Sequence, residues 1–150
     1  MEGVEVKRWL VWILWSGMAL HARAGTDWFT VVGDPKDPNA NTVQIDPEAA
    51  VMQGARKNMY MRVSRSTRRL NWESLPYRSY EARVAFNCRE KKAEYMIATF
   101  YPDPLWRGLP AITTDYADQP KPMELRDFDP NPTERIIRAA CRGVGGDVRP

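Results

Sequence analysis

Two segments in the middle of the chain alternate apolar and polar residues one by one. In residues 57–64 methionine and valine alternate with polar or charged residues, and residues 80–88 show the same period of two. Successive side chains of a strand point to opposite faces of a sheet, so each segment is expected to form a strand with one buried face. A charged turn, Arg89-Glu90-Lys91-Lys92, leads into a third strand-like segment at residues 93–101. Residues 80–101 are therefore expected to form a β-hairpin.

Shorter strand-like segments lie on both sides of this hairpin. Residues 28–32, 42–46 and 112–116 are rich in aromatic and β-branched side chains. Pro47 is expected to end the second of these segments before a short helical turn, and residues 65–79 and 118–132 are expected to be connections. Apolar residues between positions 132 and 141 recur at helical spacing. The sequence therefore predicts an α+β fold, with a five- to six-stranded antiparallel sheet and a C-terminal helix packed on one face.

The first 24 residues have the pattern of a secretory signal peptide. Lys7 and Arg8 precede an uncharged apolar run over residues 9–20, which ends in Ala22-Arg23-Ala24. The run is shorter than the roughly 20 residues of a spanning helix. We expect cleavage between Ala24 and Gly25, a domain at residues 25–142 and a flexible tail at 143–150. No membrane span is expected after cleavage, and the mature protein is predicted to be periplasmic or secreted.

Cys88 and Cys141 are the only cysteines. Export would place them in an oxidising compartment, where such a pair favours a structural disulfide. Redox-active pairs usually lie two residues apart, and two thiolates without histidine are a poor metal site. We therefore predict a disulfide that tethers the C-terminal helix to the sheet.

Catalytic groups are scarce in this chain. The only histidine, His21, lies in the predicted signal peptide, so no base remains for a nucleophilic triad. Asp127 and Asp129 are the closest carboxylate pair for glycoside hydrolysis, but they lie in a proline-rich stretch where solvated carboxylates are more common. We expect no catalytic residue, metal or cofactor. The formal net charge of only +3 gives no indication of a nucleic-acid partner.

Six basic residues lie close together in the sequence with no acidic residue between them: Arg56, Lys57, Arg62, Arg65, Arg68 and Arg69. Guanidinium groups bind sulfate and phosphate in bidentate fashion, so these residues are a candidate binding patch for an acidic (sulfated) glycan, the phosphates of lipopolysaccharide or an acidic protein surface. The alternative is a solvated strand edge whose charge prevents aggregation. Trp72, Tyr77 and Trp106 either add contact area to an interaction surface or cover the ends of a small core.

Several short motifs resemble the bacterial surface-adhesin protein E family. They are Asp27-Trp28, Ile45-Asp46-Pro47, Tyr77-Arg78-Ser79, Phe86-Asn87-Cys88 and Ala140-Cys141. The resemblance covers residues 27–141. It implies an antiparallel sheet with a C-terminal helix held across one face by the cysteine pair, and adhesion to host extracellular-matrix proteins.

These observations together predict an exported, non-enzymatic envelope binding protein that mediates adhesion to host matrix proteins. One alternative is a periplasmic structural or assembly factor with no host ligand. The other is a small periplasmic hydrolase. An exposed strand edge would also allow a homodimer.

Overall fold

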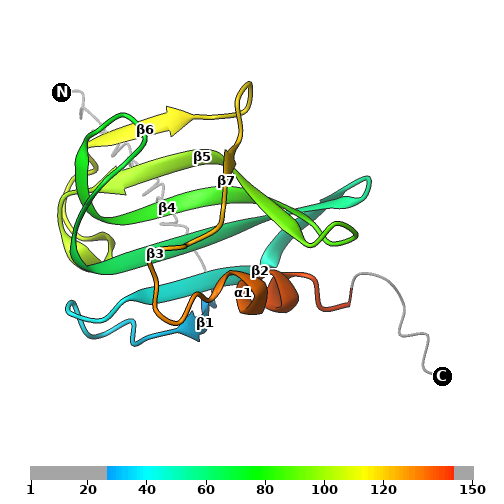
Figure 1. The fold of residues 1–150 in the computed structure, drawn as a ribbon, viewed down its shortest axis with the longest axis horizontal. Coiled ribbons are helices and arrows are strands. Elements are labelled where there is room, and N and C mark those ends of the chain that lie inside the picture. The colour runs from blue at the N-terminus through cyan, green and yellow to red at the C-terminus, as the bar shows by residue number, and fades with distance from the viewer. Residues whose placement is uncertain (1–26, 144–150) are drawn as a thin grey trace, which may run out of the picture.

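The computed structural model describes residues 27–143. Seven strands in this part of the chain form one strongly curved sheet (Figure 1): β1 (Phe29–Val32), β2 (Thr42–Gln53), β3 (Arg56–Leu70), β4 (Pro76–Asn87), β5 (Lys92–Tyr101), β6 (Ile112–Asp115) and β7 (Lys121–Pro122). A 3-10 turn, η1 (Pro104–Trp106), follows β5, and helix α1 (Thr133–Ala140) comes last. Strands β1 to β6 lie side by side in sequence order, and β7 pairs with β5. Every pairing is antiparallel.

The predicted antiparallel sheet and C-terminal helix are confirmed, whereas the predicted number of strands is wrong. The additional strand is β7, which lies in the segment, residues 118–132, that was expected to be an extended connection. It contributes two residues to the edge of β5, where Lys121 pairs with Tyr95. A strand of two residues has no alternation in sequence, so the period-two criterion does not detect it.

The second strand is longer than predicted, because Pro47 does not end it. β2 continues to Gln53, and the short helical turn expected after Pro47 is absent. The register with β3 shifts between Asp46 and Val51, and β1 pairs only with residues before Asp46. Pro47 therefore lies at an irregularity on a locally unpaired edge, a position that tolerates a residue without an N–H donor.

Residues 65–79 were expected to be a polar connection, and this prediction is also wrong. β3 runs on to Leu70 and β4 begins at Pro76, so the loop between them is short. The side chain of Asn71 organises this loop, since its Oδ1 accepts hydrogen bonds from the backbone N–H groups of Glu73 and Leu75. The register of β3 with β4 shifts between Ser64 and Arg69, which interrupts the alternation there.

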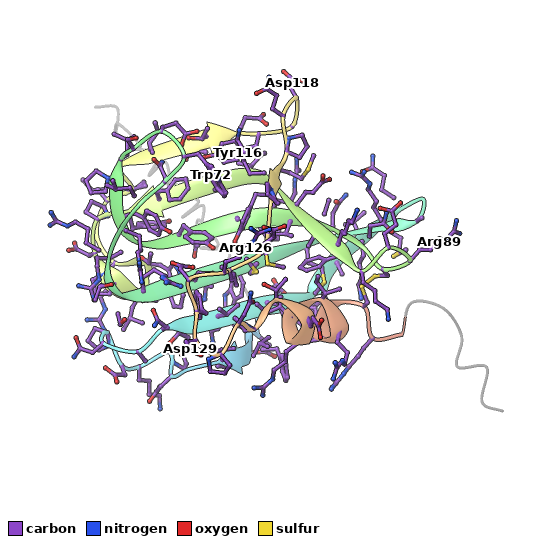
Figure 2. All side chains as sticks on the ribbon, in the orientation of Figure 1. Trp72, Arg89, Tyr116, Asp118, Arg126 and Asp129 are labelled. Atoms are coloured by element: carbon purple, nitrogen blue, oxygen red, sulfur yellow. A yellow bond between two sulfur atoms is a disulfide. The ribbon has the colours of Figure 1, made fainter. Side chains whose placement is uncertain are left out.

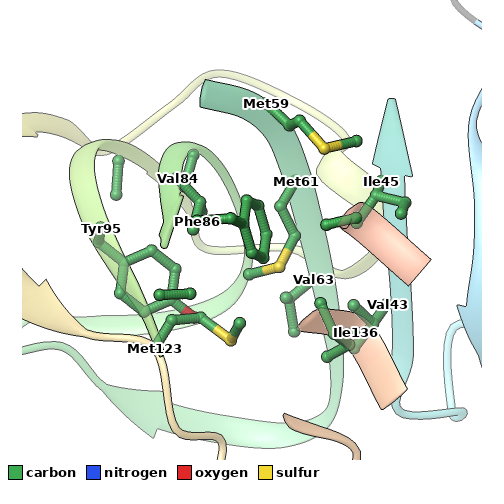
Figure 3. Close-up of a cluster of buried hydrophobic side chains, with 14 of the residues drawn as sticks. Val43, Ile45, Met59, Met61, Val63, Val84, Phe86, Tyr95, Met123 and Ile136 are labelled. Carbon is green, nitrogen blue, oxygen red and sulfur yellow. The ribbon is translucent and has the colours of Figure 1, made fainter. Parts of the chain in front are cut away.

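One face of the sheet is covered by the chain that follows β6, and we call it the inner face. Residues 116–132, which we call the covering segment, cross this face together with α1 (Figure 1), and they bring Met123, Phe128, Ile136 and Ala140 into the core. Their partners come from β2 to β5 and include Ile45, Met61, Val84 and Phe86, all of them buried (Figure 3). We call the opposite face the outer face. The core therefore lies between the inner face and the chain that covers it.

The predicted disulfide is confirmed. Cys88 lies just after β4 and Cys141 just after α1, with the two Cα atoms 5.6 Å apart. The bond ties the C-terminal end of α1 to the end of β4. The predicted signal peptide, its cleavage between Ala24 and Gly25, and nearly all of the predicted tail lie outside the described residues. Within residues 27–143, no helix has the length and apolar character needed to cross a membrane.

Candidate binding surface

The outer face presents polar and aromatic side chains from β3, β4 and β5. On β3 and β4, Tyr60 lies directly opposite Arg83, and Arg62 lies opposite Glu81. Glu81 also lies opposite Thr99 of β5. Tyr60 is 50% exposed, a large fraction for an aromatic side chain in the middle of a sheet. The period-two alternation of β3 produces this arrangement, because it sends the methionines inward and the polar residues outward.

Arg62 is held between two tryptophan rings at this surface. Its guanidinium carbon lies 4.3 Å from the ring centroid of Trp28 and 4.0 Å from that of Trp106. Nε of Arg62 donates a hydrogen bond to Gln44 at 2.7 Å. The indole of Trp106 is itself fixed, since its Nε1 donates to the carbonyl of Tyr80 at 3.0 Å. Side chains from three separate parts of the chain therefore form one preorganised aromatic–cation stack.

Arg62 stays cationic within this stack in spite of its partial burial. Burial lowers the pKa of Arg62, and the carboxylate of Glu81 acts in the opposite direction. An arginine stays protonated at neutral pH under such conditions, because its ordinary pKa is far above neutrality. The phenol of Tyr101 donates a hydrogen bond to Glu81 at 3.2 Å, and burial raises the pKa of Tyr101. Glu81 thus links the cation to a neutral donor on β5.

Two shallow hollows lie beside each other on the outer face. The first has a volume of about 210 Å³ and is lined by Tyr60, Glu81, Ala82, Arg83, Ile97 and Thr99. The second, of about 200 Å³, includes Val51 and Asn58 and shares Tyr60 and Arg83 with the first. Ligand pockets for small molecules are typically about 300–1,000 Å³. The surface is therefore suited to a partner that rests on it rather than to a small molecule enclosed by it.

The structure does not bring the six predicted patch residues together. They are spread along β3 from its first residue, Arg56, to Arg69 next to its end. Arg62 belongs to the outer-face stack, Arg56 forms an ion pair with Glu94 at 3.4 Å, and Arg68 is exposed near the other end of the strand. Lys57 is half-buried, and Nε of Arg69 lies 3.6 Å from Asp127. Binding of an acidic ligand by these residues stays a prediction.

Arg65 departs most from the sequence-based expectation, because it is buried and not exposed on a loop. Only 1% of the residue is exposed, and its Nη2 lies 2.6 Å from Oδ2 of Asp127. Its guanidinium carbon is 3.8 Å from the ring centroid of Phe128. Burial lowers the pKa of Arg65, and Asp127 opposes that shift. Arg65 thus anchors the covering segment to the inner face and is not available to a ligand.

The carboxylate pair considered for glycoside hydrolysis is divided between two environments. Asp127 contacts both Arg65 and Arg69, whereas Asp129 is exposed on the covering segment (Figure 2). Phe128 lies between them in sequence and is buried in the core. The position of Asp127 is therefore explained by an ion pair that holds the segment in place.

Trp72, Tyr77 and Trp106, for which the sequence allowed two interpretations, lie in two different environments. Trp72 and Tyr77 lie at the inner face, where the Trp72 ring is 5.5 Å from Tyr95 and 5.4 Å from Tyr116 (Figure 2). They line a cavity of about 140 Å³ together with Tyr80 and Phe100, so they cover the end of the core. Trp106 lies on the outer face. Sequence reasoning missed Trp28 as its partner, since nothing in the sequence indicates that these tryptophans meet.

One family model matches nearly all of the described chain. The family model for surface-adhesin protein E matches residues 28–142, a range that contains all seven strands, α1 and both cysteines. The chain belongs to the surface-adhesin protein E family. The resemblance found in the sequence motifs is thereby confirmed for this adhesin E domain. Comparisons with curated proteins and with solved structures found no match.

Proposed function

We propose that this adhesin E family protein is a non-enzymatic binding protein of the cell envelope, which attaches to an extracellular-matrix protein through its outer face. The aromatic–cation stack of Trp28, Arg62 and Trp106 carries the proposal. Tryptophan, tyrosine and arginine are the residues most enriched at the energetic centres of protein interfaces. A stack fixed by hydrogen bonds loses little conformational entropy when a partner binds, which favours affinity.

The form of the surface supports a macromolecular partner. The hollows beside Tyr60 are shallow, and they lie on a sheet whose other face carries the covering chain. Paired strands hold the backbones of Tyr60 and Arg83 opposite each other. An open sheet surface with aromatic and guanidinium groups suits recognition of a protein, for which broad contact matters more than enclosure.

The predicted location and the alternative functions form part of the same proposal. Export through the predicted signal peptide would deliver the protein to the periplasm or beyond the cell.

A periplasmic assembly factor with no host ligand would use the same outer face on a different partner. A hydrolase is less well supported, because Asp127 is engaged by Arg65 and Arg69. An acidic glycan as partner, and a homodimer formed through an exposed strand edge, remain further predictions.

The proposal is tested by measuring binding to a panel of immobilised extracellular-matrix proteins. We expect the double variant Tyr60→Ser/Arg83→Ser to weaken binding at least tenfold, since it removes the side chains shared by both hollows. Lys36→Gln/Arg107→Gln, which alters two exposed cations outside the outer-face hollows and outside the candidate patch, is the matched control and should bind like the unchanged protein.

Two results would contradict this function. One is equal matrix binding by the double variant and the control. The other is the absence of the protein from the outside of intact cells, measured with an antibody against the folded domain. That second result, combined with retained binding to an envelope component, would favour the assembly factor.

A further inference from the structure

One end of the molecule gathers positive charge from three separate segments. The β2–β3 hairpin, the β4–β5 turn and the C-terminal end of α1 meet there (Figure 1), and Arg89 marks the site in Figure 2. We call it the basic end, and it comprises Arg56, Lys57, Arg89, Lys91, Lys92, Arg138 and Arg142. Strand register places Lys57 opposite Phe86 and Lys92 opposite Asn87. The disulfide places Arg142 beside Arg89, because each follows one of the bonded cysteines.

Most of this charge is not neutralised within residues 27–143. Arg89, Lys91, Lys92, Arg138 and Arg142 are exposed and form no ion pair with another described residue. Arg56 does pair, with Glu94 at 3.4 Å, and Glu90 is the other acidic residue of the β4–β5 hairpin at this end. Gathering like charges in this way opposes the compact state through self-repulsion. An anionic partner would remove that cost.

Exposed apolar side chains accompany the charge. Val51 is 62% exposed and Met52 is 51% exposed, both near the end of β2. Met52 lies opposite Lys57, and the next pair in the hairpin is Gln53 and Arg56. The tip of this hairpin projects beyond the neighbouring strands (Figure 1). Apolar side chains beside lysine and arginine are typical of segments that bind at the interface of an anionic membrane.

We propose that the basic end docks on an anionic lipid surface. The exposed cations would contact phosphate headgroups, while Val51 and Met52 would enter the boundary between headgroups and acyl chains. A soluble polyanion would satisfy the cations but leave the two apolar side chains without a partner, so the combination favours a lipid surface. This site goes beyond the proposed function, since the stack at Arg62 has no part in it. Docking would orient the domain and leave Trp28, Arg62 and Trp106 free. Val51, which also lines the second outer-face hollow, would face the lipid.

The test uses the protein recovered from the cell envelope and vesicles of phosphatidylcholine with or without phosphatidylglycerol. We expect binding only to the vesicles that contain phosphatidylglycerol, with affinity falling as salt is raised. The triple variant Arg89→Gln/Lys91→Gln/Lys92→Gln should bind those vesicles roughly 100-fold more weakly. The matched control, Lys36→Gln/Arg107→Gln/Arg126→Gln, removes three exposed cations outside the basic end and should bind normally. Equal unfolding midpoints establish that both variants are folded.

A second variant separates lipid insertion from charge attraction. Met52→Ser should weaken binding to the anionic vesicles severalfold and leave retention on a heparin column unchanged. The proposal is overturned if the triple variant binds vesicles as well as its control does. It is also overturned if the protein is retained on heparin but does not bind the phosphatidylglycerol vesicles. That result would mean that the basic end binds a soluble polyanion.

Discussion

Arg62 and Arg65 lie three residues apart on β3, and each packs against aromatic rings. On the outer face, Arg62 lies between Trp28 and Trp106, and 21% of its side chain is exposed. On the inner face, Arg65 packs on Phe128 beside Asp127, and only 2% of its side chain is exposed. The two residues have the same chemistry, but different parts of the chain meet them.

The difference shows how a covering segment changes the role of a side chain. A guanidinium removed from water needs a carboxylate and good geometry, and Asp127 on the covering segment supplies the carboxylate for Arg65. Arg62 keeps part of its hydration and is held by rings and an amide, so its exposed edge stays available. The inner arginine therefore stabilises the fold, whereas the outer arginine is placed to bind.

The largest loss of unfolding free energy is expected from removing the disulfide, because this bond holds α1 on the inner face. Its cysteines are 53 positions apart in sequence. The double variant Cys88→Ala/Cys141→Ala should lose about 4 kcal/mol of unfolding free energy, the chain-entropy estimate for closing a loop of that length. Urea unfolding measures the change. A midpoint equal to that of the unchanged protein would show that packing alone holds the helix.

The second largest effect concerns the inner ion pair. Asp127→Ala should cost about 3 kcal/mol, because it leaves the guanidinium of Arg65 buried without its carboxylate. We expect the lower end of the range for buried pairs, since the Asp127 side chain is 47% exposed. Arg65→Met in the same background should recover much of the loss by replacing the charge with an apolar side chain. If it recovers none, Arg65 contributes through packing that methionine does not reproduce.

A smaller effect on stability is expected for the outer arginine. Arg62→Met should cost about 1 kcal/mol, the size of a partly exposed cation–π contact, while it removes the cation from the proposed binding surface. Urea unfolding and matrix binding are measured on the same preparation. If Arg62→Met lost as much unfolding free energy as Asp127→Ala, Arg62 would stabilise the fold as Arg65 does, and the two arginines would not differ in role.

The smallest effect on stability at neutral pH is expected from the buried tyrosines, because their titration changes the unfolding free energy only in alkaline solution. The hydroxyls of Tyr80 and Tyr95 lie 2.5 Å apart, and burial raises the pKa of both. Burial, with the hydrogen bond to Glu73, raises the pKa of Tyr116 to about 12. Unfolded tyrosines lose their protons near pH 10, so the contribution of these tyrosines to stability should be fully present below that pH and be lost as the pH rises toward 12 and beyond.

This pH dependence is measured by urea unfolding at a series of alkaline pH values. The double variant Tyr80→Phe/Tyr95→Phe should show a shallower fall than the unchanged protein, because two of the titrating groups are gone. Identical slopes for the two proteins would mean that other groups govern alkaline unfolding.

Predictions from the sequence were correct where the spacing of apolar residues within a single element indicates its type and its buried face. The alternation around Met59 and Met61 predicted the buried face of β3, and the apolar residues near Ile136 predicted α1. They failed where a distant contact decides the outcome. Arg65 shares the face of Met59 and Met61 if the alternation continues, but its charge and the arginines that follow favoured a solvated connection from residue 65 onward. Its burial depends on Asp127, 62 residues further along the chain.

The amino-acid sequence by itself determined the antiparallel strands, the terminal helix and the cysteine pairing, because period, composition and the number of cysteines are local or countable properties. The tertiary structure alone decided which arginine is buried, which tryptophans meet around Arg62, and how three basic segments converge at one end. Those outcomes depend on the curvature of the sheet and on the path of the covering segment. Both arise from long-range packing, which no single stretch of residues encodes.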